Sequence, residues 1–509
     1  MLPMIGRSGR TAALAAALMS LVVASPALAA GLRIGLDADP DVLDPAQGGS
    51  VSGRQVFAAM CDKLVGVAPG GGFRPELATK WDWSADGKAL TLTLRDGVLF
   101  QDGEPLDAAA VKVNLDRYRT APISRRKSEL KPVADVTAVD RLTVKITLAQ
   151  PYAPLVAVLS DRAGMMLSPK ALAQAGDGIG QHPVCAGPFE FVERQQGDHI
   201  LLKRFDRYWN RDAVFLDSVT YRPMPDETVR LLNLRSGDLD LIEHVPTVEV
   251  AALRDDPAVT VVDAPSIAYD LITFNIGHGD KAKSPIGQDA RVRRALELSL
   301  DRDAINAAAY EGMFIPGNQP EVPGTTFEDP GHPMPARDVD KAKALLAEAG
   351  VPNPSFTLLV TNSPVTQQVG QMIQAMAGEA GFDIKLQALE AATLAASADA
   401  GDFQAAIAIW SGRLDPDANM AAWAGCDAFQ NWGRYCNRDF DAVLAQARAT
   451  TDQAARVGLY RQAAGLFLAD LPQIVLYHYR SVWGMRRAVQ GFTPYPDGLM
   501  RLQGVKIAG

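Results

Sequence analysis

The side chains that could do chemistry are scattered along the chain rather than gathered into a catalytic motif. No H-E-x-x-H, G-x-S-x-G or P-loop pattern is present in the sequence. Ser124-Arg125-Arg126-Lys127 fits the S-x-x-K pattern of penicillin-binding proteins, but no K-T-G follows, and its basic character favours a solvated turn. The histidines show no metal-ligand spacing: His182, His199, His244, His278, His332 and His478. We expect no catalytic residue, no metal site and no cofactor.

The four cysteines could form disulfides if the chain is exported. Cys426 and Cys436 lie close in sequence, and a bridge between them would close a short loop, worth about 3 kcal/mol. Cys61 and Cys185 could form a second pair or remain buried thiols, because three pairings of four cysteines are possible. The absence of C-x-x-C argues against a zinc ribbon or a thioredoxin-type site.

The first thirty residues have the layout of a secretory signal peptide. Arg7 and Arg10 precede an uncharged apolar stretch, Pro26 interrupts it, and Ala27-Leu28-Ala29 supplies small residues for cleavage. A membrane-anchoring helix is the alternative, but it would need about 20 apolar residues without such a break. No cysteine lies near the cleavage site. We therefore expect residues 1–29 to be removed and the mature chain to carry no lipid anchor.

Length and composition indicate a large globular chain. It has 509 residues, which is more than one hydrophobic core usually organises. Hydrophobic residues make up 48% and charged residues 21%, values that exclude a disordered or fibrous protein. The net charge of -9 argues against a nucleic-acid partner, which would need a basic surface.

Hydrophobic periodicity separates a strand-rich first half from a second half that alternates strands and helices. Alternating apolar residues predict strands at 32–36, 90–94 and 142–148, and the stretch 75–180 holds one helix near 108–118. After residue 285, helical spacing appears at 292–299, 342–349 and 369–376, with apolar runs at 356–360, 382–386, 405–410 and 474–477. The strand–helix–strand succession over 356–386 is the unit that builds parallel sheets.

One long segment carries a specific resemblance. From Pro75 the chain reads P-E-L-A-T-K-W-D-W-S-A-D-G-K-A-L-T-L-T-L-R-D-G-V-L-F-Q-D-G-E-P-L-D-A-A-A-V. This resembles the signature of the dipeptide-, oligopeptide- and nickel-binding family of extracytoplasmic solute-binding proteins, which feed ABC importers. Further elements match in order, including Leu43-Asp44-Pro45, Gly187-Pro188-Phe189, Tyr208-Trp209 and Phe274-Asn275. The resemblance covers nearly the whole mature chain.

The resemblance implies a fold and a division of the chain. Members of this family are α/β proteins with a bilobal, type II periplasmic-binding-protein-like fold and an extra strand-rich subdomain in lobe I. Their two lobes close on ligand by hinge bending. Here lobe I would take residues 30–285 and 491–509, with the subdomain at about 75–180. Lobe II would take residues 286–490, so that the chain crosses between the lobes twice.

The resemblance also points to ligand-contacting positions. Trp410 to Asp417 match the segment that lines the pocket of peptide binders, where an acidic residue holds the peptide amino group. Arg413 stands in that slot, and the stretch 361–368 lacks the basic residue that would hold a peptide carboxylate. We expect Arg413 to pair with an anionic group of the ligand, because a guanidinium offers a planar charged fork. The alternative is that it pairs with Asp415 or Asp417.

The remaining ligand-binding candidates are aromatic or polar residues of the matching segments. Trp410, Trp432 and Tyr435 could form aromatic walls, or they could be core residues. Asp415 of the same segment is a further candidate, and Tyr269, Asn275 and Phe189 are weaker candidates that the resemblance implies.

We expect a periplasmic, monomeric solute-binding protein that captures a peptide-like or other small organic solute. It would deliver this solute to an inner-membrane ABC permease and ATPase complex, and it would perform no chemistry. An exported hydrolase acting on peptides or glycans is the alternative from another class.

Overall fold

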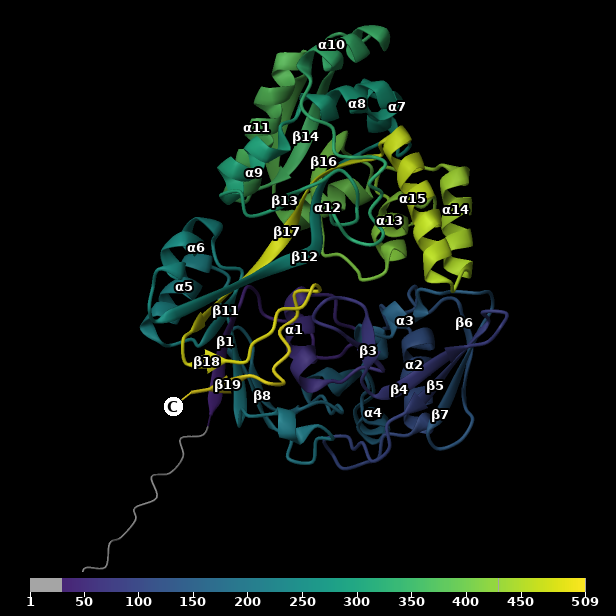
Figure 1. Ribbon diagram of the computed structural model, residues 1–509, viewed down its shortest axis with the longest axis vertical. Helices are drawn as coiled ribbons and strands as arrows, with labels where there is room; N and C mark the ends of the chain where they lie inside the picture. Colours follow the sequence, from purple (N-terminus) through teal and green to yellow (C-terminus); the bar gives the residue numbers. More distant parts are fainter. Residues whose placement is uncertain (1–29, 429, 509) are drawn as a thin grey trace, which may run out of the picture.

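The computed structural model describes residues 30–428 and 430–508 and shows two α/β bodies joined by long strands (Figure 1). We call the lower body in Figure 1 the first lobe and the upper body the second lobe. One eleven-stranded sheet runs through both, in the order β15-β14-β16-β12-β17-β11-β1-β10-β9-β8, with β13 paired to β17. The predicted signal peptide, residues 1–29, lies outside the described residues.

The first lobe is built around a short parallel core. Strand β1 lies between β10 and β11 and runs parallel to both, and β9 and β8 continue the sheet with antiparallel pairing. The C-terminal segment returns to this lobe, where Met500 and Leu502 join the buried cluster around Leu32 and Ile34. The elements are β1 (Gly31–Leu36), α1 (Val51–Met60), β8 (Phe189–Gln195), β9 (His199–Arg204), β10 (Ser218–Pro223), α5 (Glu227–Ser236), β11 (Leu241–Glu243), α6 (Thr247–Arg254), β18 (Val489–Gln490) and β19 (Lys506–Ile507).

A strand-rich subdomain forms the right-hand side of the first lobe in Figure 1. Its antiparallel sheet has the order β4-β5-β7-β6, and α2 packs on it. The alternating leucines of the sequence bury one face, with Leu90 and Leu92 fully inside. The elements are β2 (Val65–Val67), β3 (Phe73–Pro75), β4 (Ala78–Trp83), β5 (Ala89–Leu94), α2 (Ala108–Thr120), β6 (Val133–Ala138), β7 (Thr143–Leu148), α3 (Leu155–Val158) and α4 (Pro169–Ala175).

The second lobe contains the predicted strand–helix–strand unit. Strand β14 pairs in parallel with β15 and β16, and α11 connects β14 to β15, ending at Gly381, whose φ of 107° is the left-handed conformation that glycine adopts most easily. The elements are α7 (Pro285–Gln288), α8 (Ala290–Ser299), α9 (Arg302–Tyr310), β13 (Ile315–Pro316), α10 (Val339–Glu348), β14 (Ser355–Thr361), α11 (Pro364–Ala380), β15 (Asp383–Leu389), α12 (Ala391–Asp399), β16 (Ala405–Trp410), α13 (Pro416–Ala424), α14 (Arg438–Ala449) and α15 (Gln453–Asp470).

Two long antiparallel strands, β12 (Val259–Phe274) and β17 (Gln473–Arg486), run from one lobe into the other (Figure 1). Residues 259–265 of β12 lie opposite 480–486, and residues 269–273 lie opposite 473–478, with a register shift between Pro265 and Tyr269. Only residues 474–477 of this pair were predicted as strand. The regular pairing of the two strands is interrupted at this point.

Both cysteine pairs are bridged in the structure. Cys61, directly after α1, is bonded to Cys185, before β8, with 4.9 Å between their Cα atoms. Cys426 and Cys436 are bonded within the loop between α13 and α14. The predicted local disulfide and the less certain long-range pair are therefore both confirmed.

The lobes also touch away from the crossing strands. The backbone nitrogen of Ala153 in the first lobe donates to the carbonyl of Arg448 in α14, at 2.7 Å. Among the described residues, no helix has both the length and the apolar character that crossing a bilayer requires.

Candidate functional site

A pocket of about 110 Å³ lies between the lobes, where the loop after β16 faces the segment around α3. The first lobe supplies Arg54, Glu129, Tyr152, Ser160 and Asp161, and the second lobe supplies Arg413, Leu414, Asp415 and Ala418. The pocket walls thus come from both lobes, and several of them are charged.

The loop that carries Arg413 is held in a fixed path. Strand β16 ends at Trp410, and Asp415 caps α13 by accepting from the backbone nitrogen of Asp417. Between them, Gly412 has a φ of 71°, and a Cβ there would lie 2.1 Å from the carbonyl oxygen of Ile267. Glycine is therefore required at this position, for both its conformation and its size.

Asn419, on the first turns of α13, braces the same loop. Its Oδ1 accepts from the Trp410 indole nitrogen at 3.1 Å and from the Arg413 backbone nitrogen at 2.8 Å. Its Nδ2 donates to the Arg413 carbonyl at 2.9 Å and to Glu321. One buried amide thus fixes both ends of the segment from 410 to 413. Sequence reasoning did not single out this residue.

The guanidinium of Arg413 has local contacts but no carboxylate partner. Its Nη1 donates to the Ser411 hydroxyl at 3.1 Å and to the Gly412 carbonyl at 2.6 Å, and its Cζ lies 4.9 Å from the centre of the Trp410 ring. Within the described part of the chain, no carboxylate oxygen forms an ion pair with it. Burial lowers the pKa of Arg413, and the charge of Arg54 lowers it further.

Neither aspartate of the predicted alternative pairs with Arg413. Asp415 accepts from Arg456 Nη2 with both oxygens at 2.9 Å, and Asp417 accepts from Arg448 Nε at 2.7 Å. Both carboxylates are buried. They therefore neutralise Arg448 of α14 and Arg456 of α15, and they form no ion pair with Arg413.

The first lobe places an ion pair on the opposite wall. Arg54, on the buried face of α1, donates from Nε to Asp161 Oδ1 at 3.2 Å, and its Nη2 lies 3.1 Å from Asp161 Oδ2. Asp161 also caps the short turn that follows it. Burial alone would raise the pKa of Asp161, but the charges of Arg54 and Arg162 outweigh it and hold the pKa well below its usual range.

Two more buried arginines stand behind this pair. Arg126 and Arg162 both donate to the carbonyl of Gly48, and Arg126 also pairs with Glu129 of the pocket wall. The sequence predicted a solvated turn at residues 124–127. This prediction is wrong for Ser124 and Arg126, because both are buried. Arg126 reaches inward to Glu129 and Gly48. Sequence reasoning missed all these first-lobe groups, since no local motif marks them.

The predicted aromatic candidates of the second lobe pack against one another. Trp410 lies edge-on to Trp423, and Trp423 lies edge-on to Trp432, with ring centres 5.9 and 5.3 Å apart. Tyr269 is fully buried and donates to the carbonyl of Asn419. Of these, Trp410 packs against the guanidinium of Arg413, which lines the pocket. Ligand contact by Trp410, Trp432 and Tyr269 stays a prediction.

Three further candidates lie in the packed interiors of the lobes. Tyr435 donates to Asp470 at 2.7 Å within the second-lobe core. Asn275 donates to the carbonyls of Gly401 and Phe403, and Phe189 belongs to the first-lobe core. None of the three lines the pocket described above.

A family model described as "Bacterial extracellular solute-binding proteins, family 5 Middle" matches residues 72–431. The chain belongs to this family. The relatives include the glutathione-binding protein GsiB of Pectobacterium atrosepticum, which is 32% identical over 503 residues, or 96% of each chain. GsiB of Salmonella typhi is 31% identical over 494 residues, covering 94% of this chain and 95% of the relative.

Solved structures agree with this family assignment. The PBP AgaA in complex with agropinic acid, from A. tumefaciens R10, has a TM-score of 0.80 and 28% identity and covers 94% of this chain and 99% of its own. The periplasmic binding protein DppA of Helicobacter pylori, in complex with the peptide STSA, has a TM-score of 0.80, 25% identity and the same coverage. The predicted bilobal, type II fold class is confirmed.

This family 5 protein is a solute-binding component of an ABC importer rather than an enzyme. The relatives are binding proteins, one for glutathione and one seen with a peptide. The family assignment therefore removes the exported-hydrolase alternative and leaves the identity of the solute as the open question.

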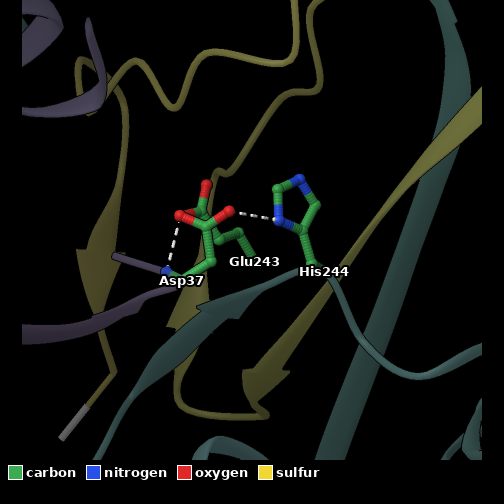
Figure 2. Close-up of side chains that lie close together, drawn as sticks. All are labelled: Asp37, Glu243 and His244. Carbon is green, nitrogen blue, oxygen red and sulfur yellow. Dashed lines mark hydrogen bonds and ion pairs between the residues drawn. The ribbon is translucent and has the colours of Figure 1, made fainter. Parts of the chain in front are cut away.

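The residues of this family 5 protein best grouped to hold a metal ion are Asp37, Glu243 and His244, at the carboxyl ends of β1 and β11 (Figure 2). His244 Nδ1 lies 3.2 Å from Asp37 Oδ2, and Glu243 accepts from Gln55 Nε2 and from the Asp37 backbone nitrogen. Ser52 donates to the other oxygen of Asp37. Both carboxylates and His244 Nδ1 are thus already engaged, and the bonds from Ser52 and Gln55 tie the two strand ends to α1.

Proposed function

We propose that this family 5 protein captures a small organic anion, either an acidic peptide-like solute or another organic acid, in the pocket between its lobes. The observation that carries the proposal is the pocket-facing guanidinium of Arg413, which has no carboxylate partner among the described residues, while Asp415 and Asp417 are each bound to another arginine. A charged fork of this kind suits a carboxylate, which can accept two parallel hydrogen bonds.

The relatives' ligands support an acidic solute. GsiB is named as a glutathione-binding protein, and AgaA is seen with agropinic acid. A peptide held by both of its ends is a weaker candidate, because Arg413 stands where an acidic residue would meet a peptide amino group. The stretch 361–368 likewise offers no basic side chain to a peptide carboxylate.

The delivery role requires export and two moving lobes. We propose that residues 1–29 are a cleaved signal peptide, that the mature chain works as a monomer in the periplasm without a lipid anchor, and that it hands its solute to an inner-membrane permease and ATPase. Residues 30–285 and 491–509 would form lobe I and 286–490 lobe II. The β12–β17 irregularity near Pro265 and Tyr269 supports a hinge there.

Isothermal titration calorimetry of the mature chain tests this function, with glutathione and agropinic acid as probes. We expect at least one acid to bind, and Arg413→Gln to weaken that binding at least tenfold. Arg438→Gln is the matched control, because its side chain is 77% exposed on α14 and outside the pocket. Unchanged affinity in Arg413→Gln would contradict the proposal.

A further inference from the structure

The pocket is bordered by a separate excess of positive charge on each lobe. On the first lobe, two guanidiniums, Arg54 and Arg162, share the single carboxylate of Asp161. Arg54 forms the ion pair, whereas Arg162 donates only to the carbonyl of Gly48. Because one carboxylate cannot balance two guanidiniums, this centre keeps about one positive charge.

The second-lobe centre is Arg413 alone. Its neighbours Asp415 and Asp417 are bound to Arg456 and Arg448, so they do not balance it. The other charged groups around the pocket cancel locally, since Glu129 pairs with Arg126 and Asp497 pairs with Arg501. The two centres therefore remain uncompensated within the described chain.

Uncompensated charge in a buried place is costly unless a partner neutralises it. Arg162 is 4% exposed, and its Nε has no hydrogen-bond partner among the described residues; Arg126 Nε is in the same position. Burial lowers the pKa of Arg162 to about 9, and the neighbouring arginines contribute, Arg54 and Arg413 among them. The lobes thus bring the like charges of Arg54 and Arg413 to one pocket, with Arg162 lying behind the Arg54–Asp161 pair.

We infer that the solute carries two acid groups, one for the Arg54–Asp161–Arg162 centre of the first lobe and one for Arg413 of the second lobe. This inference rests on the proposed function and deepens it from an anion to a dianion. A solute with one acid group at each end neutralises both centres at once and bridges the lobes. A monoanion leaves one buried cation without a partner.

The test compares matched acids by calorimetry on the full mature chain. The probes are the straight-chain α,ω-dicarboxylates of four to eight carbons and the monoamide of each, which has nearly the same size and one charge fewer. We expect the best diacid to bind at least tenfold more tightly than its monoamide. Arg162→Gln should reduce that ratio below threefold. Arg54→Gln neutralises the same centre if Arg162→Gln fails to fold.

The outcomes separate this inference from the proposed function. The diacid and its monoamide could bind equally well, and Arg413→Gln could weaken both. This result would overturn the inference of two acid groups but would leave the proposed anion site at Arg413 standing. An unchanged diacid preference in both Arg162→Gln and Arg54→Gln would do the same. Affinities that do not respond to Arg413→Gln, or no binding by either series, would contradict both ideas. Arg438→Gln serves again as the charge-matched control.

Discussion

Arg54 of the first lobe and Arg413 of the second lobe line one pocket from opposite sides, close enough that the charge of Arg54 adds to burial in lowering the pKa of Arg413. Like charges brought together by lobe closure oppose that closure unless an anion lies between them. The same residues that recognise an acidic solute would therefore also make the closed form depend on its presence. This coupling is useful to a carrier, because an importer must distinguish loaded from empty protein.

Asp161 should be the most sensitive carboxylate near the pocket. Asp161→Asn keeps a side-chain oxygen to cap the turn at Arg162 but removes the charge that holds Arg54 and Arg162. Because a buried pair that loses one partner leaves an unbalanced charge, we expect the free energy of unfolding to fall by about 3 kcal/mol. Urea titration at pH 7 measures it.

The control for that experiment is Asp206→Asn. Asp206 pairs with Arg204 on the surface, where its side chain is 84% exposed, so its removal should change stability by less than about 1 kcal/mol. Equal losses in the two variants would show that Asp161 does not compensate the buried arginines.

Gly412 should be required for both stability and binding. A Cβ at this position would lie 2.1 Å from the Ile267 carbonyl oxygen, and the φ of 71° disfavours a side chain in any case. We expect Gly412→Ala to displace the Arg413 loop, lower the melting temperature and weaken binding of any acid that Arg413 holds.

Gly458→Ala is the matched control for the glycine experiment. Gly458 lies within α15, and no heavy atom lies within 4 Å of the Cβ that would be added. It should stabilise the protein by about 0.5–1 kcal/mol, because alanine favours a helix. Loss of binding in both variants would point to a general effect rather than to the loop.

Local patterns predicted the elements that local physics controls. The β14–α11–β15 unit followed from hydrophobic period and from Gly381, whereas Arg413 was located by the resemblance of residues 410–417 to the pocket segment of the family. Strand β12 escaped notice because most of its first eleven residues are half-buried and show no alternation. A strand that crosses between lobes has no constant inside face, so sequence alone gives no period for it.

The first-lobe half of the pocket could not be predicted for a different reason. Arg54 and Asp161 are 107 residues apart, and only the packing of α1 against the turn after α3 brings them together. Conversely, Tyr435 and Phe189 are aromatic residues of matching segments, yet their neighbours place them in lobe interiors. Residue type marks a candidate, but the direction of its side chain depends on tertiary contacts.

The two disulfides should differ in their contribution to stability. The Cys61–Cys185 bridge closes a separation of 124 residues and the Cys426–Cys436 bridge one of 10. On the chain-entropy estimate these are worth about 5 and about 3 kcal/mol. We expect Cys61→Ser/Cys185→Ser to lower the free energy of unfolding more than Cys426→Ser/Cys436→Ser. Denaturant titration of both double variants checks the order, and the reverse order would contradict it.

The Asp37–His244 ion pair should make stability depend on pH (Figure 2). Burial opposes ionisation of both groups, but their mutual hydrogen bond and charge outweigh it, raising the pKa of His244 above 6.5 and lowering the pKa of Asp37 to about 2. The Asp37 contribution is present above about pH 4 and is lost as the pH falls towards 2. The His244 contribution is fully present below pH 6.5 and is lost as the pH rises through its raised pKa.

His244→Asn tests this window, because asparagine tolerates the left-handed φ of 53° at this position. The His244 side chain is 52% exposed, so solvent screens the pair and the loss at pH 6 should be no more than about 1 kcal/mol. As the pH rises towards 9, through the raised pKa of His244, the variant and the wild type should differ less. Thermal unfolding at pH 6 and at pH 9 measures the difference between His244→Asn and the wild type. When Asp37 is replaced by Asn, this difference should no longer depend on pH. A constant difference at pH 6 and 9 would show that His244 acts through packing instead of charge.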